Sequence, residues 1–232
     1  TVHALKGISF SIEEGQFVTI MGKSGSGKST LLNILGCLDS PSSGNYLLDG
    51  SSVQSMNKDQ RARIRNQKIG FVFQNYNLLA NTTAIENVEL PLMYNPEVST
   101  SEREKRAIEA LQRVELGDRL YHKSNQMSGG QMQRVAIARA LVNNPAVILA
   151  DEATGNLDTR TSYSILKLLQ QLHKEGRTII FVTHNNEITS FSQRNIVLRD
   201  GKILSDTYNP TILSAAEALE KLPKEEDEEE TL

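Results

Sequence analysis

The chain has 232 residues and a formal net charge of −3, with 25 Lys and Arg against 28 Asp and Glu. This length is sufficient for one sizeable hydrophobic core, and the balance of charges excludes a nucleic-acid binder that works through bulk positive charge. The single cysteine excludes an intramolecular disulfide, and no apolar run is long enough to span a bilayer. We therefore expect a soluble intracellular protein in which Cys37 is a small buried side chain.

Short apolar runs alternate with helical patterns along the chain. Strands are expected at 17–21, 69–73, 146–150 and 178–182, and amphipathic helices at 28–38 and 160–175. The apolar face of the first helix contains Leu31, Leu32, Leu35 and Leu38, and Gly176 closes the second helix. This alternation predicts an α/β fold, with a largely parallel sheet covered by helices on both faces.

The segment 76–143 interrupts this alternation. It contains helix patterns without a convincing strand, and Ser101 with Glu104 predicts a capping box at the start of one helix. We interpret the segment as a helical subdomain inserted into the α/β core.

The predicted core therefore consists of residues 1–75 and 144–206, which with the insertion form one domain over 1–206. Residues 207–232 are expected to contain a short amphipathic helix, Ser214–Leu222, followed by an acidic run. A run of like charges with few apolar residues predicts a solvated, disordered tail.

GKSGSGKST follows a predicted strand and opens a predicted helix, so it satisfies G-x-x-x-x-G-K-[ST] in the context that this motif requires. Its glycines allow backbone N–H groups to curl around a phosphate, and the helix N-terminus adds a partial positive charge. Lys28 is expected to reach the β- and γ-phosphates, Ser29 to bind Mg²⁺, and Thr30 to lie near the α-phosphate. The residues of this candidate site are Gly22, Lys23, Ser24, Gly25, Ser26, Gly27, Lys28, Ser29 and Thr30.

Polar side chains also follow three other predicted strands. Asp151 and Glu152 end AVILADE, Gln74 follows IGFVF, and His184 follows TIIFVT. The carboxyl ends of parallel strands share one edge, where ligands bind. We expect Asp151 to hold Mg²⁺ through water, and Glu152 to act as a base or to orient the attacking water. Gln74 is a candidate ligand of Mg²⁺ or water, and His184 a candidate donor to the γ-phosphate or that water, although each residue type alone is more often structural.

MSGGQMQRVAIARAL, with NNPAVILADEATGNLD close behind it, resembles the signature, Walker B and D-loop series of ATP-binding cassette ATPases. With the glycine-rich loop, Gln74 and His184, six motifs follow the family's order. The resemblance covers residues 1–206. It implies a RecA-like P-loop NTPase fold, with a parallel core, an antiparallel β edge and an inserted helical subdomain. It also implies ATP hydrolysis with ATP and Mg²⁺ as cofactors.

The resemblance also assigns Ser128, Gly129 and Gly130 to a second phosphate site, for the ATP held by another copy of the chain. A helix N-terminus with a hydroxyl and glycine N–H groups is suited to an anion. Two copies are expected to close head to tail over two ATP molecules, with Asp158 crossing the interface. A helix cap without further function is the alternative for Ser128.

Within the family, GCLDSPSSG, RIRNQKIGFVFQNYNLL and TAIENVELPL are similar to the branch of macrolide-efflux and lipoprotein-release ATPases. This similarity implies a peripheral subunit on the cytoplasmic side of the membrane that drives a separate permease with an extracytoplasmic domain. It places the permease's coupling helix in a groove at Tyr76, Leu78 and Leu79, although these side chains suit a core equally well. A switch acting on a cell-division or other non-transport complex is the alternative function.

Two departures from the family pattern follow the acidic pair. Ala153 stands where the family usually has proline, and Gly155 and Asn156 stand where a small residue and alanine are common. Neither change removes a reacting group. The aromatic residue that stacks on adenine in the family is expected upstream of residue 1. A GTPase or a small-molecule kinase accounts for the P-loop but not for MSGGQ, and NKDQ at 57–60 misses the guanine-binding pattern at its last position.

Overall fold

The computed structural model describes residues 3–95 and 98–223. A six-stranded sheet in the order β4-β5-β6-β1-β7-β8 forms its centre, and a small second sheet pairs β2 with β3. All neighbours in the large sheet run parallel except β8, which pairs antiparallel with β7 at one edge. The strands are β1 (Phe17–Met21), β2 (Leu47–Leu48), β3 (Ser51–Ser52), β4 (Ile69–Phe73), β5 (Val147–Asp151), β6 (Thr178–Thr183), β7 (Arg194–Arg199) and β8 (Lys202–Tyr208).

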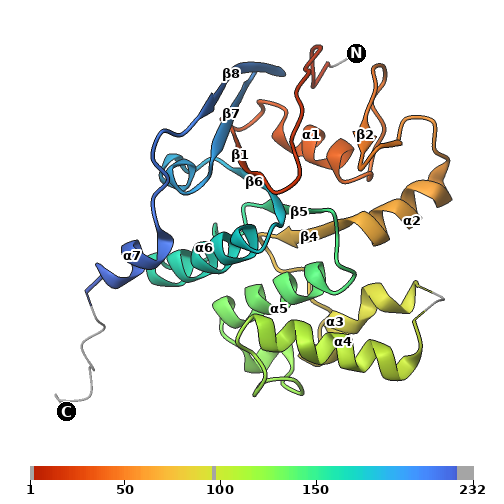
Figure 1. Ribbon diagram of the computed structural model, residues 1–232, viewed down its shortest axis with the longest axis vertical. Coiled ribbons are helices and arrows are strands. Elements are labelled where there is room, and N and C mark those ends of the chain that lie inside the picture. Colours follow the sequence, from red (N-terminus) through yellow and green to blue (C-terminus); the bar gives the residue numbers. More distant parts are fainter. Residues whose placement is uncertain (1–2, 96–97, 224–232) are drawn as a thin grey trace.

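Helices cover the large sheet on both faces (Figure 1). The α-helices are α1 (Lys28–Leu35), α2 (Lys58–Lys68), α3 (Ala84–Met93), α4 (Thr100–Arg113), α5 (Gly129–Leu141), α6 (Thr159–Lys174) and α7 (Ala215–Glu220), and two 3₁₀ helices are η1 (Ser124–Gln126) and η2 (Asn186–Phe191). The predicted α/β fold, with a parallel core and an antiparallel edge, is confirmed. The four predicted strands agree with the observed ones to within one residue at each end.

The two faces follow from the alternation of side chains along each strand. In β5, Val147 and Leu149 belong to the apolar cluster beneath α1 and α2, whereas Ile148 and Ala150 belong to the cluster beneath α5 and α6. Because both sets are apolar, β5 is a central strand buried on both sides. This double burial holds the carboxyl end of β5 rigidly at the edge of the sheet.

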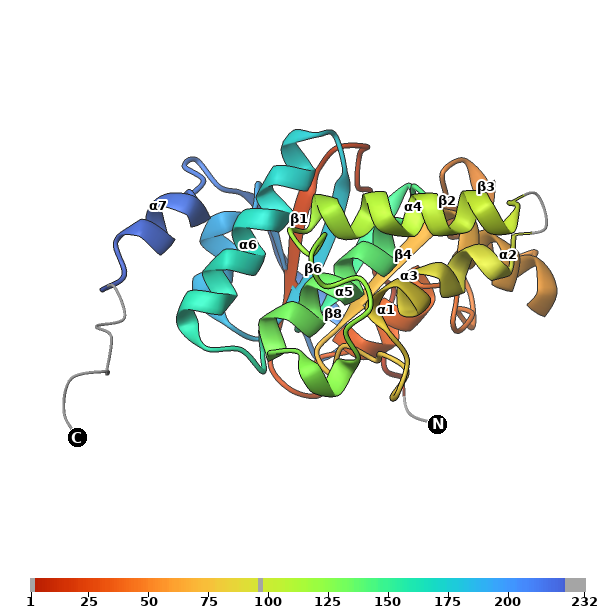
Figure 2. The same cartoon turned by 90° about the horizontal axis from the view of Figure 1, so that it is seen from below.

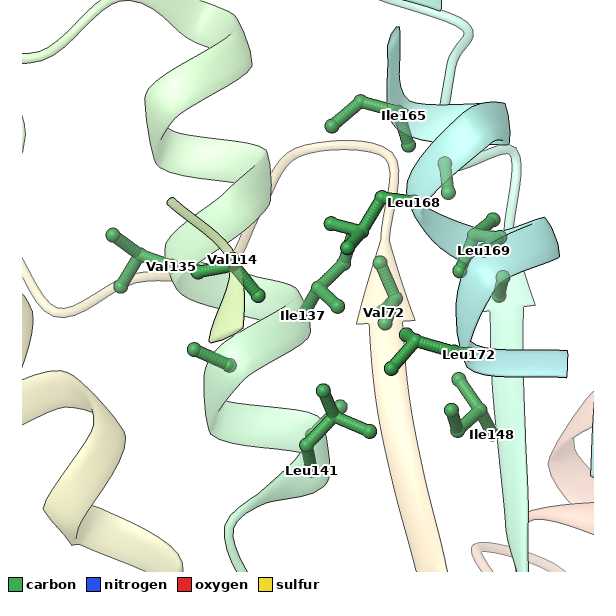
Figure 3. Packing of buried hydrophobic residues seen from close by; sticks show 14 of the residues in the cluster. Val72, Val114, Val135, Ile137, Leu141, Ile148, Ile165, Leu168, Leu169 and Leu172 are labelled. Atoms are coloured by element: carbon green, nitrogen blue, oxygen red, sulfur yellow. The ribbon is translucent and has the colours of Figure 1, made fainter. Parts of the chain in front are cut away.

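The segment between β4 and β5 is helical, as the sequence predicts. The helices α3, α4 and α5 lie together beside β4 (Figures 1 and 2), and the described residues between 76 and 143 form no strand beyond an isolated bridge between Thr83 and Lys123. Ile137 and Leu141 of α5 point toward Leu168 and Leu172 of α6 (Figure 3). This packing attaches the second half of α5 to α6.

The predicted capping box at Ser101 and Glu104 is wrong. The helix α4 begins earlier, with Ser99 as its N-cap, and the Ser99 hydroxyl accepts a hydrogen bond from Glu102 N at 3.3 Å. The chain contains two serines two residues apart, each followed by an acidic residue three positions later. Only the extended backbone of Ser99 satisfies the geometry of a cap.

The first helix also ends earlier than predicted, at Leu35, and Leu38 is 51% exposed rather than buried. The Phe71 ring packs so closely on Gly36 that a Cβ there would lie 2.3 Å from its Cζ atom. Cys37 then takes a left-handed φ of 54° and turns the chain out of the helix. Cys37 itself is buried, as predicted.

Toward the end of the chain, α7 lies within the predicted Ser214–Leu222 helix and packs against α6 (Figures 1 and 2). The predicted acidic tail lies outside the described residues, apart from its approach at Pro223. Within the part of the chain that the structure describes, no helix combines the length and apolarity needed to cross a membrane.

The contact between α5 and α6 makes a testable contribution to stability. Ile137 is completely buried, so Ile137→Ala is expected to lower the free energy of unfolding by about 2–5 kcal/mol, through lost burial and a residual cavity. Denaturant titration measures this change. Leu204→Ala in β8, where the side chain is 61% exposed, is the control and is expected to change stability by about 0.5 kcal/mol or less. Equal losses in both variants would contradict the assigned packing.

Candidate active site

Parallel register brings four strand ends to one edge of the sheet. Asp151, the last residue of β5, lies opposite Phe73 of β4 and Val182 of β6. One position further along β6, Thr183 lies opposite the last residue of β1, Met21. The residues that come next in the sequence are therefore neighbours in space. They are Gln74, Glu152, His184 and Gly22, all of which the sequence predicts for the site.

The glycine-rich loop curls around the ammonium group of Lys28. Lys28 Nζ donates to Gly22 O at 2.5 Å and to Lys23 O at 3.2 Å. This geometry places a fixed positive charge inside the loop, where a phosphate needs it. Ser29 is exposed in the first turn of α1, next to Lys28.

Close packing imposes the glycines of this loop. A Cβ at Gly22 would lie 2.4 Å from Leu198 O and 2.5 Å from Ser26 Oγ, so no other residue fits. Gly27, the N-cap of α1, has a φ of 103°, which only glycine adopts without strain. Ser26 is buried, and its N–H donates to Lys23 O at 3.2 Å, so the loop is partly closed on itself.

The adjacent acidic residues Asp151 and Glu152 have different surroundings. Glu152 has a left-handed φ of 48°, a sparsely populated conformation for a non-glycine residue, which turns the chain sharply after β5. Asp151 remains in the strand. Burial and the neighbouring Glu152 raise the pKa of Asp151, whereas the Lys28 charge acts in the opposite direction. A cation at Asp151 would act against both of these effects, because it stabilises the charged carboxylate.

The Glu152 carboxylate is held through both of its oxygens. His184 Nδ1 lies 2.7 Å from Oε1, and Thr183 Oγ1 donates to Oε2 at 3.1 Å. The Glu152 side chain is 16% exposed, whereas the His184 side chain is 68% exposed. A carboxylate fixed in this way at the sheet edge is a suitable base, and the exposed His184 lies on its solvent-facing side.

Gln74 is held by the loop that follows the acidic pair. Its Nε2 donates to Asn156 Oδ1 at 3.0 Å, and Asn156 Nδ2 donates to Gln74 O at 3.3 Å and to Asn75 Oδ1 at 2.8 Å. Gln74, Asp151 and Ser29 supply amide, carboxylate and hydroxyl oxygens, which are the ligands that Mg²⁺ prefers. The donor chemistry of these residues therefore fits a magnesium ion.

The MSGGQ segment begins α5 with a reciprocal cap. The Ser128 hydroxyl accepts from Gln131 N at 3.2 Å, and Gln131 Oε1 accepts from Ser128 N at 2.9 Å. A hydroxyl that accepts in a cap still carries its own O–H donor. Ser128 is exposed, so this donor and the start of α5 are accessible from outside the chain.

The two glycines of this segment meet other site loops of the same chain. A Cβ at Gly129 would lie 2.8 Å from Tyr76 Oη and 3.3 Å from Leu157 Cδ2, and a Cβ at Gly130 would lie 2.6 Å from Thr161 Cγ2. The family resemblance explains these glycines by the close approach of a phosphate. Packing within the chain is a second reason for them.

Asp158, predicted to cross an interface between copies, caps α6. Its Oδ1 accepts from Thr161 N at 2.8 Å, and hydrogen bonds from Thr161 lower the pKa of the Asp158 carboxyl. Asp158 is exposed, and it lies near the beginning of α5 because Thr161, in the first turn of α6, packs on Gly130. The candidate residues on α5 and α6 therefore lie on one accessible side of the chain.

Comparison with known proteins identifies the family of the chain. The profile of the ABC transporter family matches residues 5–155. An ABC transporter ATP-binding protein of Thermotoga maritima is 56% identical over 202 residues, which are 87% of this chain and 86% of that protein. The chain belongs to the ABC transporter family. It is an ATP-binding cassette that hydrolyses ATP, and we refer to it below as the cassette.

Two further relatives indicate what the cassette is similar to. The macrolide export ATP-binding/permease protein MacB of Hyphomonas neptunium is 52% identical over 208 residues, which are 90% of the cassette but 32% of that protein. The ATP-binding cassette MJ0796 of Methanocaldococcus jannaschii has been solved as a dimer in a post-hydrolysis state with ADP and Pi. That structure matches with a TM-score of 0.80 at 49% identity, over 89% of the cassette and 91% of its own chain.

The sequence alone gives no role to several polar residues of the site region, among them Thr183, whose hydroxyl donates to Glu152 Oε2. Asn156 bonds to Gln74 and Asn75, Arg139 donates to Tyr76 O at 2.8 Å and to Asn77 O at 2.6 Å, and Gln133 Nε2 donates to Ala153 O at 2.7 Å. Arg139 and Gln133 lie within the periodic pattern of α5, and their partners are distant in sequence. Of these contacts, only that of Asn156 has a signal in the sequence, because the Gly-Asn pair at 155–156 is typical of a turn.

The Lys28 geometry predicts the effect of removing its charge. Lys28→Ala is expected to weaken ATP binding by about 10- to 100-fold or more, because a charge-assisted contact to phosphate is lost. Isothermal titration calorimetry measures this change. Lys167→Ala, which removes an exposed lysine of α6, is the matched control and is expected to bind as the wild type does. Unchanged affinity in Lys28→Ala would contradict the assignment.

Proposed function

We propose that the cassette is the energy-coupling subunit of an exporter-type transporter, and that it works as a head-to-tail dimer with two ATP molecules at the interface. The observation that carries this proposal is the division of the site into two parts. One part is the sheet edge with Lys28 and Glu152, and the other is the exposed start of α5 at Ser128. Each part is suited to one side of a triphosphate.

At the sheet edge, we assign the binding of the phosphates to the 22–30 loop and Lys28. Glu152 accepts a proton from the attacking water or orients that water, and the bonds from His184 and Thr183 fix its direction. The bond to Glu152 does not use His184 Nε2, and we assign this atom to the γ-phosphate, to which it donates when the imidazole carries both protons. Ser29, Gln74 and Asp151 hold Mg²⁺, which neutralises charge on the phosphates when bound.

The start of α5 receives the γ-phosphate of the second copy. The Ser128 O–H and the N–H groups of Gly129 and Gly130 provide donors at a helix N-terminus, where the helix dipole favours an anion. The dimeric state of MJ0796, at 49% identity, supports this arrangement. Asp158 then lies close to the interface, where it couples the two ATP sites.

The partner that the cassette drives is a membrane permease, with the cassette bound to its cytoplasmic face. Support comes from the relative in Hyphomonas neptunium, whose name combines an ATP-binding and a permease function and of which the cassette spans 32%. We propose that the corresponding permease here is a separate chain with an extracytoplasmic domain. The exposed Leu79 and the half-buried Tyr76 beside Gln74 are the proposed contacts, whereas Leu78 packs against the core. The helices within 76–143 act as the subdomain that carries this contact.

The proposed base and dimer can be tested together. Glu152→Gln keeps the shape of the side chain but removes the base, so ATP binding is expected to persist while turnover falls by about 10²–10⁴-fold. The ATP-bound dimer is then expected to accumulate and to elute early in size-exclusion chromatography. A variant that hydrolyses ATP at the wild-type rate would contradict the base assignment.

A second substitution in this background separates the two parts of the site. Glu152→Gln with Ser128→Arg is expected to bind ATP but to remain monomeric, because the bulky side chain at the start of α5 prevents it from receiving the ATP held by the facing copy. Ser124→Arg in η1, close to the signature but outside the proposed phosphate site, is the matched control. Dimers that persist with Ser128→Arg would contradict the proposed interface.

The transport proposal predicts a specific partner. The tagged cassette, purified from detergent-solubilised membranes of its host, is expected to retain a membrane protein with a domain outside the bilayer. Mass spectrometry identifies the partner, and Leu79→Glu is expected to reduce its recovery, because a charge is placed in an apolar contact. Recovery of ribosomes, DNA or a soluble complex in place of a permease would contradict the proposal.

A further inference from the structure

The amide group of Gln74 has two chemically different ends, and its orientation decides what it can bind. Oε1 is an acceptor and a possible cation ligand, whereas Nε2 is a donor that cannot bind a cation. The Asn156 Oδ1 contact at 3.0 Å occupies Nε2. Turning the Gln74 amide over would place two oxygens against each other, so this contact favours a single orientation.

Asn156 also holds the backbone and the neighbour of Gln74. Its Nδ2 donates to Gln74 O at 3.3 Å and to Asn75 Oδ1 at 2.8 Å. With one accepted and two donated hydrogen bonds, the orientation of the Asn156 amide is itself determined by the network. The three bonds connect the Gln74 loop to the loop that begins at Glu152, across 81 or 82 positions of sequence.

Two tight turns place Asn156 in this position. Gly155 N donates to Glu152 O at 2.8 Å, and Leu157 N donates to Thr154 O at 3.2 Å. A Cβ at Gly155 would lie 2.7 Å from Gln74 Nε2 and 3.2 Å from Gln74 Cδ. Any side chain at 155 therefore displaces the Gln74 amide. Because that amide is the end of a flexible side chain, the displacement does not require the fold to change.

We propose that Asn156 is a positioning residue for Gln74. It occupies Nε2, leaves Oε1 for a metal ion, and links the Gln74 loop to the loop that leads to Asp158. The statement that Oε1 is left for a metal ion rests on the metal role proposed above for Gln74. An alanine at 156 would provide none of these bonds, and a side chain at 155 would oppose them.

Nuclear magnetic resonance of side-chain amides tests the contact directly. In ¹⁵N-labelled cassette, the NH₂ signal that disappears in Gln74→Ala belongs to Gln74. That signal is expected to shift, and to exchange faster with water, in both Asn156→Ala and Gly155→Ala. Asn45→Ala, which removes an exposed asparagine bonded to Gln54, is the control and leaves the signal unchanged. A Gln74 signal that is the same in all three variants would overturn the proposal.

The dependence of ATP hydrolysis on Mg²⁺ gives a second readout that a general loss of stability does not alter. Asn156→Ala is expected to raise the Mg²⁺ concentration for half-maximal turnover by roughly two- to tenfold, since fewer Gln74 side chains keep the binding orientation. In Gln74→Ala with Asn156→Ala, the shift is expected to equal that of Gln74→Ala alone. Additive shifts would overturn a role that acts through Gln74.

The two readouts separate this inference from the proposed metal site. If Gln74→Ala leaves the Mg²⁺ dependence unchanged while Asn156→Ala alters the Gln74 amide signal, the metal role of Gln74 is wrong and the positioning by Asn156 stands. If Gln74→Ala shifts the Mg²⁺ dependence and Asn156→Ala affects neither readout, the metal role stands and the positioning by Asn156 is wrong.

Discussion

The register of four parallel strands is the constraint on which the site depends. Because β4, β5, β6 and β1 are neighbours and end at the same level, the residues after them share one edge. A slip of one residue in β5 would exchange its two apolar faces and move Glu152 away from His184. Both faces of β5 are apolar, so the slip is opposed by the shapes of the side chains: Val147 and Leu149 pack in one cluster, and Ile148 and Ala150 in the other. The packing of the core and the geometry of the site therefore have the same cause.

The loops at this edge contact one another through hydrogen bonds and close packing. His184 holds Glu152, Asn156 holds Gln74, and Tyr76 lies against Gly129. Each of these contacts joins two loops that are distant in sequence and belong to different motifs. These contacts connect the loops physically, which is one requirement of an ATP-driven protein in which binding at one surface alters another.

Conformational freedom is restricted at a few positions. Glu152 keeps a left-handed backbone despite its side chain, and Gly27 keeps one at the start of α1. The conformation of Glu152 persists only where surrounding packing determines it, whereas glycine adopts that of Gly27 without strain, and both residues lie beside the phosphate-binding edge. The strain is local, because the strands and helices on either side are buried and regular. The site is thus rigid at its base, while the start of α5 remains open to a second surface.

Local patterns in the sequence determined the alternation of strands and helices, the P-loop and the polar residues at the strand ends, because each depends on neighbours within a few positions. They did not determine the cap of α4, where Ser99 and Ser101 compete, or the early end of α1 beneath Phe71. The contacts of Asn156 and Arg139 also depend only on the tertiary structure. Their partners lie more than 60 positions away, and no short-range pattern encodes a hydrogen bond that the fold itself creates.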